Sequence, residues 1–305
     1  MRQTIFFLCC FCGSLFSIKA QQYVDIGKLF YANTPVNQFD TLTNGTRVEE
    51  FGLDLNIPVP LQNGHALLFG FYGEGISTAV NPVEPNLTSV YTLNPRLGIN
   101  YQHSVKWTGT YLLLPKLSSD LKQIGRNDLQ LGAIALLKYK KHQRFAWQFG
   151  LYYNGERFGP FFVPLFGFYH LSSDERFEMN VRLPLAVDMN YRLNARLKAG
   201  LEFSAFVRSY HLNEPYRGNP ENYLVKASNE LFAYLHVDLT KNLLLKTKAG
   251  YSIGRNFRVY DLEDRVTWGL SAFRFNDERQ QLNADFRDGL VFRAELIYRF
   301  RLDDN

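Results

Sequence analysis

Cysteine is scarce in this chain and is confined to its first residues. The 305 residues include three cysteines, Cys9, Cys10 and Cys12. All three lie in a segment that we expect to be removed from the mature protein. Because the remaining chain has no thiol, disulfide frameworks, CxxC redox centres and cysteine-ligated metal sites are excluded for the mature protein.

That segment, residues 1–20, has the composition of a secretory signal peptide. Arg2 gives it a positive start, an apolar and aromatic stretch follows as far as Ile18, and the small residue Ala20 marks a cleavage point. We therefore predict a cleaved signal peptide over residues 1–20 and one exported domain over residues 21–305. The alternative is a buried N-terminal helix or strand.

Long apolar runs and basic blocks are also missing. Beyond residue 20, no stretch approaches the ~18 consecutive apolar residues that a membrane-spanning helix needs, which excludes a helical membrane protein. The formal net charge is +5, but basic and acidic residues are interspersed along the chain, and the densest basic run is Lys138-Tyr139-Lys140-Lys141. This even distribution of charge argues against a nucleic-acid partner.

What the chain does contain is a large number of aromatic residues in a two-residue rhythm. It has 26 Phe and 18 Tyr. Apolar residues occupy alternate positions in most segments, for example in residues 51–57, 145–153, 197–207, 231–239 and 292–300. Alternation gives a strand two unlike faces, and segments of about ten residues are long enough to cross a bilayer as tilted strands.

The turns between these segments alternate between short and long. Residues 140–143, 193–195 and 240–242 are short turns, whereas residues 115–127, 211–227 and 261–288 are long polar loops. Short turns at one end and long loops at the other are typical of bacterial outer-membrane barrels. We therefore predict an all-β fold: a transmembrane antiparallel up-and-down β-barrel in the outer membrane of a Gram-negative-type envelope.

The number of strands depends on one segment, residues 176–192. An outer-membrane barrel with both termini on the periplasmic side has an even number of strands. Pro184 cannot donate a hydrogen bond to a central ladder, so it marks either a short hairpin or a bulge in a longer strand. A hairpin gives fourteen strands, and twelve is the alternative number.

Between Tyr101 and His170 the chain contains several distinctive runs. They are Trp107-Thr108-Gly109-Thr110, residues 113–120, residues 128–132 and residues 149–164. In these runs the chain resembles a family of bacterial outer-membrane β-barrels of unknown function. The resemblance implies a single-domain barrel in the outer membrane, and it implies no particular activity, substrate or cofactor.

Charged residues occupy the inward positions of the last strands. Lys246 and Lys248 of the penultimate strand are expected beside Arg293, Glu295 and Arg299 of the last strand. Closure of the barrel is expected to bring Asp25 and Lys28 of the first strand alongside them. Buried charges of both signs persist only when they are paired or hydrated. The cluster therefore predicts either a salt-bridge network that fills the lumen or a hydrated path for small solutes, and both alternatives stay open.

Aromatic residues near strand ends are candidates for the two interfacial girdles of such a barrel. They are Trp107, Tyr111, Trp147, Tyr153, Tyr191, Tyr251 and Tyr298. The expected partners are outer-membrane lipids. The last strand, with aromatic residues up to Phe300, is similar to the strands that the barrel-assembly machinery recognises, so this machinery is a second expected partner.

One pair of residues fits a hydrolase. His170 and Ser172 are two positions apart, which on a strand places both side chains on one face, where a histidine would activate the hydroxyl. The spacing is similar to that of barrel lipid hydrolases, although Ser172 is expected in a periplasmic turn and lipid hydrolysis needs the outer leaflet. The remaining histidines lack neighbouring ligands, so no metal site and no cofactor are predicted.

These features lead to three hypotheses for the function. The charged lumen suggests a passive channel for small solutes, and the mixed signs of its charges suggest a structural or surface-interaction barrel with a filled lumen. The third hypothesis is a lipid hydrolase that uses His170 and Ser172, although the chain as a whole is expected not to be an enzyme. The long loops, residues 211–227 and 261–288, are candidate lids, plugs or binding surfaces.

Overall fold

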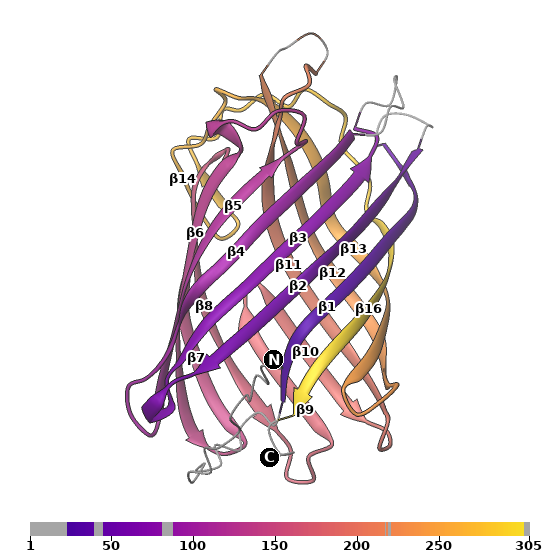
Figure 1. Ribbon diagram of the computed structural model, residues 1–305. Helices are drawn as coiled ribbons and strands as arrows, with labels where there is room; N and C mark the ends of the chain where they lie inside the picture. Colours follow the sequence, from indigo (N-terminus) through magenta and orange to yellow (C-terminus); the bar gives the residue numbers. More distant parts are fainter. Residues whose placement is uncertain (1–22, 40–44, 81–87, 217, 219–220, 302–305) are drawn as a thin grey trace, which may run out of the picture.

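The computed structural model describes residues 23–39, 45–80, 88–216, 218 and 221–301 (Figure 1). The predicted signal peptide, residues 1–20, lies outside the described residues. The strands are β1 (Tyr23–Gln38), β2 (Gly45–Pro60), β3 (Ala66–Thr78), β4 (Thr88–Gln102), β5 (Trp107–Ser119), β6 (Leu129–His142), β7 (Phe145–Glu156), β8 (Gly159–Leu171), β9 (Phe177–Leu183), β10 (Ala186–Arg192), β11 (Leu197–Leu212), β12 (Asn222–Asp238), β13 (Leu243–Asp261), β14 (Trp268–Leu270), β15 (Phe273–Phe275) and β16 (Gly289–Arg301). The described helices, η1 (Gln62–Gly64) and η2 (Arg126–Asp128), are too short to span a membrane.

The strands form one closed antiparallel barrel. From β1 to β8 each strand pairs with the next, and β1 pairs on its other side with β16. The ring continues from β16 through β13, β12, β11 and β10 to β9, which pairs with β8 and closes it. Since β14 and β15 lie outside this ring, the wall has fourteen strands. The predicted barrel with fourteen strands is confirmed, and the alternative number of twelve is wrong.

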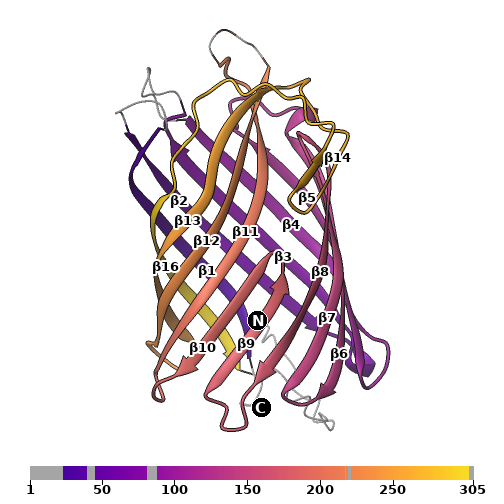
Figure 2. The ribbon, with the colours of Figure 1, turned by 180° about the vertical axis from the view of Figure 1, so that it is seen from behind.

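The segment around Pro184 forms a short hairpin. β9 and β10 have seven residues each and are joined by Pro184 and Leu185. Because both strands are short, β8 pairs with β9 only from Phe166 to Leu171, and β11 pairs with β10 only as far as Ser204. Figure 2 shows β9 and β10 confined to the end of the barrel where the short turns lie. At the loop end, the wall therefore lacks two strands.

Alternation sorts the side chains of each strand between the outside and the lumen. On β12, Leu231 and Leu235 are exposed, whereas Phe232 and Tyr234 are buried. The exposed residues of neighbouring strands join into an apolar outer surface, which suits lipid rather than water. The two-residue rhythm of the sequence thus corresponds to a lipid-facing side and a lumen side.

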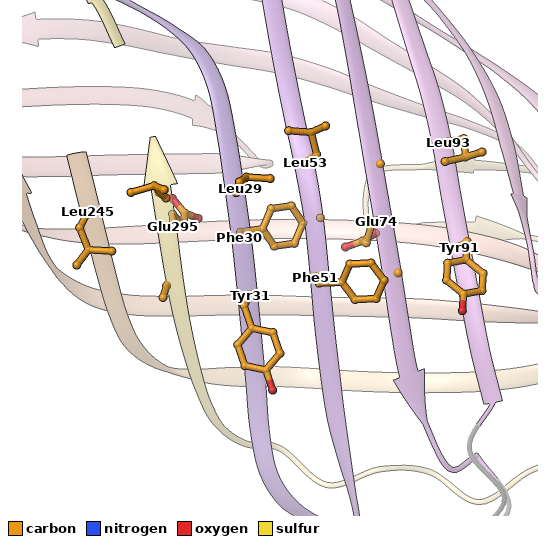
Figure 3. A pocket seen from close by; sticks show the side chains of 15 residues that line it. Leu29, Phe30, Tyr31, Phe51, Leu53, Glu74, Tyr91, Leu93, Leu245 and Glu295 are labelled. Atoms are coloured by element: carbon orange, nitrogen blue, oxygen red, sulfur yellow. The ribbon is translucent and has the colours of Figure 1, made fainter. Parts of the chain in front are cut away.

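A pocket on this outer surface lies over β13, β16 and β1 to β4 (Figure 3). Its volume is about 580 Å³, and the exposed side chains of Leu29, Tyr31 and Phe51 help to frame it. A Cβ atom on Gly75 would lie 2.5 Å from the Phe51 ring, so this ring occupies the space that a side chain would need. The pocket is almost wholly apolar and belongs to the lipid-facing surface.

At the loop end, β11 leans inward and meets β5. His211 of β11 forms a parallel bridge with Ser119 of β5, and the Asp120 amide donates a hydrogen bond to the His211 carbonyl at 3.1 Å. From the alternation along β11, the Ser209 side chain is expected on the outer face of the strand, yet it is fully buried. Its carbonyl accepts a hydrogen bond from Gln130 of β6 at 3.0 Å. The end of β11 is therefore covered by β5 and β6 instead of facing lipid.

Two apolar clusters lie at the loop end of the barrel. The first lies between β11 to β13 and β1 to β4 and consists of Phe39, Val48, Ile76, Val80, Val90, Tyr210, Leu212, Tyr216, Leu224, Phe257, Val259 and Phe286. The second lies between β12, β13 and β8 and consists of Phe158, Phe161, Val163, Leu165, Tyr223, Val225, Tyr260, Leu262 and Val266. Neighbouring residues of β12 thus face different clusters, and both faces of the strand are packed.

The two long loops differ from their predicted form because parts of them join the sheet. β11 extends to Leu212 and β12 begins at Asn222, so only residues 213–221 of the predicted loop 211–227 connect the strands. Within residues 261–288, β14 pairs in parallel with β8. The strand ends around residues 222–225 were missed because both of their faces are buried, which removes the alternation that marks the other strands.

Candidate functional site: the barrel lumen

The inward side chains of β2 to β7 surround a cavity, which we call the lumen cavity. Its volume is about 620 Å³. Leu185, from the turn between β9 and β10, and Arg208 of β11 also line the cavity. Val24 of β1 and the exposed side chains of Ile57 and Phe69 belong to its lining as well. The cavity extends from Ala66 and Asn100, which pair beside the short turns, to Lys116, nearer the loop end. Its volume is in the range of about 300–1,000 Å³ that is usual for small-molecule sites.

The charged residues that line the lumen cavity are cations, and each of them is paired with a carboxylate. The pairs are Arg96 with Asp54, Lys116 with Glu156, and Arg208 with Glu74. The carboxylates themselves do not contribute to the lining. The lumen cavity therefore presents the positive partner of each pair to its contents.

The uncharged lining consists of amide, hydroxyl and apolar side chains. Among the amides are Asn56, Asn94 and Asn100 of β2 and β4. The apolar side chains include Leu112, Leu114, Ile134 and Leu185, from β5, β6 and the turn after β9. An amphipathic lining of this kind can contact both the polar and the apolar part of a small molecule.

The lumen cavity ends at a polar group that we call the closing layer. It consists of the half-buried Arg208 and four buried residues, Glu74, Lys116, Glu156 and Ser209. Glu156 of β7 accepts a hydrogen bond from Lys116 at 2.9 Å. Its other oxygen accepts from the Ser209 amide at 2.7 Å and from the Ser209 hydroxyl at 2.5 Å. Because Ser209 belongs to β11, the closing layer connects distant strands across the lumen.

Two further ion pairs cross the lumen. Arg208 of β11 contacts Glu74 of β3, and it also donates a hydrogen bond to the Tyr72 hydroxyl at 2.9 Å. Lys226 of β12 binds Glu50 of β2 at 2.6 Å. The sequence analysis missed all of these contacts. The charged residues of these ion pairs have inward positions in the alternation, but their partners depend on the inward lean of β11.

The predicted charge cluster includes a network that runs along the wall. Lys248 binds Glu202 at 2.7 Å and Glu295 at 2.8 Å. Lys246 binds Glu202 at 2.6 Å, and Arg293 binds Glu295 at 2.9 Å. We call these five residues the wall network. Glu202 was not anticipated, although its inward position in the alternating β11 segment was an available signal.

Arg299, the remaining residue of the predicted cluster, lies apart from the wall network. It binds Asp25 of β1 at 2.5 Å, and its guanidinium carbon lies 3.6 Å from the centre of the Tyr23 ring. Asp25 was expected beside the last strand because β1 closes the barrel against β16. The pairing of β1 with β16 places the two residues directly opposite one another.

Residues 83–285 match a protein family that is described as a domain of unknown function, DUF6268. The match covers more than half of the chain. The chain belongs to this family. No curated protein matches this DUF6268 barrel in sequence.

Several solved structures are similar to the DUF6268 barrel at low sequence identity. The COG4313 outer membrane channel from Pseudomonas putida F1 is 10% identical, with a TM-score of 0.46 over 94% of this chain and 100% of the channel. The P. putida toluene transporter TodX is 9% identical, with a TM-score of 0.39 over 90% of each chain. P. putida OprB is 10% identical, with a TM-score of 0.36 over 92% of this chain and 94% of OprB.

The girdle candidates lie at two levels of the DUF6268 barrel. Those near the short turns are Trp107, Tyr111, Trp147, Tyr191 and Tyr298. Tyr153 and Tyr251 lie nearer the loops. Trp147 and Tyr153 are half-buried by neighbouring phenylalanine rings, and the other five side chains are exposed on the outer surface.

In the DUF6268 barrel, His170 and Ser172 make separate contacts. The Ser172 hydroxyl donates a hydrogen bond to Asp174 at 2.5 Å and accepts one from the Phe177 amide at 2.9 Å, which fixes the turn between β8 and β9. The hydrogen bond from Ser172 also holds the pKa of Asp174 below its usual value. The His170 ring packs against the Phe145 ring. The hydroxyl therefore has a structural role in a short turn.

Other histidines of the DUF6268 barrel pair with single carboxylates. His211 binds Asp128 at 2.7 Å, and His236 binds Asp238 at 3.0 Å. Within the part of the chain that the structure describes, no group of three His, Cys, Asp or Glu side chains is arranged to hold a metal ion.

Proposed function

We propose that this outer-membrane barrel is a passive channel for small solutes and that the closing layer blocks its path in the present structure. The lumen cavity of about 620 Å³ is the observation that supports this proposal. Protein interiors gain stability when such spaces are filled by side chains, and unfilled volume costs packing energy. A cavity with charged, amide and apolar walls is therefore better explained by a solute than by the stability of the wall.

The end of β11 is the element that has to move for the path to open. Glu156 binds Ser209 of β11, and Glu74 contacts Arg208 of the same strand. β11 also contacts β5 through the His211 bridge. A shift of this strand end would break both carboxylate contacts of the closing layer, and it would connect the lumen cavity with the loop end.

The test is solute permeation through the refolded protein in liposomes and planar bilayers. In the double variant Lys116→Ala/Glu156→Ala, both charges of one pair are removed together, so no buried charge is left unpaired. We expect low permeability to small solutes for the wild type and clearly higher permeability for this variant.

The matched control is Asp25→Ala/Arg299→Ala, which removes an ion pair between neighbouring strands, and we expect it to keep the wild-type permeability. If both the wild type and the Lys116→Ala/Glu156→Ala variant are impermeable, the proposed channel function is wrong.

A second candidate function is a structural or surface-interaction barrel with a filled lumen. The two apolar clusters favour it because they pack the interior at the loop end with side chains. This function requires that the Lys116→Ala/Glu156→Ala variant stays impermeable, since the apolar clusters would still block the lumen. The same permeation experiment therefore separates the two candidates.

We further propose that residues 1–20 direct export and that residues 21–305 form one barrel domain, inserted by the barrel-assembly machinery. The support for this partner is β16, on which the outward residues Phe292, Tyr298 and Phe300 continue the aromatic alternation almost to the end of the strand. Interfacial aromatic side chains such as Tyr298 would contact the lipid headgroups.

We assign no catalytic role to His170 and Ser172. A nucleophilic serine needs a base within hydrogen-bond reach, whereas Ser172 donates its hydrogen bond to Asp174 and stabilises a turn. The turn also lies at the end of the barrel with short connections, away from the outer leaflet in which a lipid hydrolase would act.

A further inference from the structure

Two arginine side chains lie beside one tyrosine ring in the lumen cavity. The guanidinium carbons of Arg96 and Arg208 lie 5.5 Å and 4.6 Å from the centre of the Tyr72 ring. Their side chains are 25% and 27% exposed, whereas Lys116 is only 5% exposed. The two arginines therefore supply the accessible positive charge of the cavity, and Lys116 is enclosed in the closing layer.

Each of these arginines uses one terminal nitrogen for its own carboxylate. The Nη1 atom of Arg96 donates to Asp54 at 2.7 Å, and the Nη1 atom of Arg208 donates to Glu74. A guanidinium group has five N–H donors in a planar fork, so one engaged nitrogen leaves donors for a further acceptor. Because Asp54 and Glu74 are not part of the lining, an acceptor in the cavity meets N–H groups and not their carboxylate oxygens.

The strands that follow β4 in the ring contribute apolar side chains to the lining next to these arginines. β4, which carries Arg96, is followed by β5 with Leu112 and Leu114 and by β6 with Ile134. Leu185 extends this surface from the turn between β9 and β10. A molecule in the cavity thus meets accessible positive charge from β4 and β11, and aliphatic side chains from β5 and β6.

We propose that the lumen cavity binds small organic anions that have one carboxylate and an apolar body, such as short aliphatic or aromatic monocarboxylic acids. The carboxylate accepts hydrogen bonds from Arg96 and Arg208, since guanidinium groups match carboxylates in charge and geometry. The apolar body lies against Leu112 and Ile134. This inference rests on the proposed channel function for its physiological meaning and names the class of solute.

The test is calorimetric titration of the whole barrel, refolded in a non-ionic detergent, with hexanoate. We expect hexanoate to bind about tenfold or more tightly than hexanamide, because hydrogen bonds to charged groups are the stronger ones. Hexylammonium should bind more weakly than either. The variants Arg96→Gln and Arg208→Gln should each lower the affinity for hexanoate about tenfold, and Arg96→Lys should restore part of it.

The control variant is Arg258→Gln, which removes an arginine outside the lumen cavity and should leave hexanoate binding unchanged. A second variant, Leu112→Glu, keeps both arginines and their ion pairs, so it serves if the glutamine variants do not fold. It adds a negative charge to the apolar side and should weaken the binding of hexanoate much more than that of hexanamide.

Equal affinities for hexanoate and hexanamide would overturn the inference, as would hexanoate binding that neither glutamine variant weakens. The outcome for the channel hypothesis does not depend on the outcome for hexanoate binding. Selective hexanoate binding to a barrel that is impermeable even in the Lys116→Ala/Glu156→Ala variant overturns the channel and supports the anion site. Permeation without selective hexanoate binding supports the channel and overturns the anion site.

Discussion

The closing layer and the wall network are both sets of buried ion pairs in one lumen, but they connect different parts of the ring. The wall network joins β11, β13 and β16, which lie on one arc of the barrel. The closing layer joins β7 and β3 to β11, and these strands are widely separated in the ring order. Buried ion pairs therefore join nearby strands of the wall in the wall network, whereas in the closing layer they span the lumen.

The two sets also differ in how many partners each cation has. Lys248 binds two carboxylates of the wall network, and Lys246 binds Asp188 at 3.0 Å in addition to Glu202. Among the described residues, Lys116 has one ion-pair partner, Glu156. The wall network thus tolerates the loss of one carboxylate, whereas the closing layer does not.

The largest effect on stability is expected for Glu156→Ala. This change leaves Lys116 buried without a counter-charge, and breaking a buried pair in this way costs about 3–5 kcal/mol. The measurement is urea unfolding of the barrel in lipid vesicles. The double variant Lys116→Ala/Glu156→Ala should be more stable than Glu156→Ala alone, and the reverse order would contradict the role that we give to this pair.

For Leu224→Ala we expect a loss of stability comparable to or smaller than that of Glu156→Ala. This variant tests whether apolar packing also stabilises the loop end of the barrel. Leu224 is fully buried in the first apolar cluster, and truncating such a leucine costs about 2–5 kcal/mol because it leaves a cavity. The matched control is Leu235→Ala on the lipid-facing side of the same strand, where lipid can fill the space. Equal losses of unfolding free energy for the two variants would show that the loop end is not tightly packed.

The smallest effect is expected for Glu202→Ala in the wall network. Its loss removes hydrogen bonds to charged groups, which are worth about 1.5–3 kcal/mol, while Lys246 keeps Asp188 and Lys248 keeps Glu295. Solute permeability should stay at the wild-type level, because the closing layer is intact. An increase in permeability as large as that of the Lys116→Ala/Glu156→Ala variant would remove the distinction between the two sets.

The sequence predicts the barrel well because lipid and lumen impose opposite demands on neighbouring residues. This is clear in residues 231–239 and 292–300, where exposed apolar residues alternate with buried ones. Pro184 marked an irregular position, either a hairpin or a bulge, because it cannot join a central ladder, and the structure has the hairpin. Closure of the ring also predicted that Asp25 lies beside the charged residues of the last strand, since the first and last strands of a closed barrel are neighbours, and Asp25 is opposite Arg299.

The contacts across the lumen could not be predicted in the same way. Glu156 and Ser209 are 53 residues apart, and they meet only because the end of β11 leans under β5 and β6. The alternation predicts on which face of its strand a side chain lies, but it does not predict which residue that side chain contacts. At residues 222–225 the sequence does not show even which face is the outer one, because the apolar clusters cover both faces of β12.

The short hairpin of β9 and β10 leaves part of β8 without its usual neighbour. A free strand edge recruits further strands, and unpaired backbone groups are costly where lipid excludes water. Here the loop after β13 takes the place of the missing strand. The Val266 amide donates to the Phe158 carbonyl at 2.8 Å, and the Ser271 amide donates to the Phe162 carbonyl at 2.8 Å. A loop from a distant part of the chain thus protects the edge to which a second copy of the protein would otherwise add.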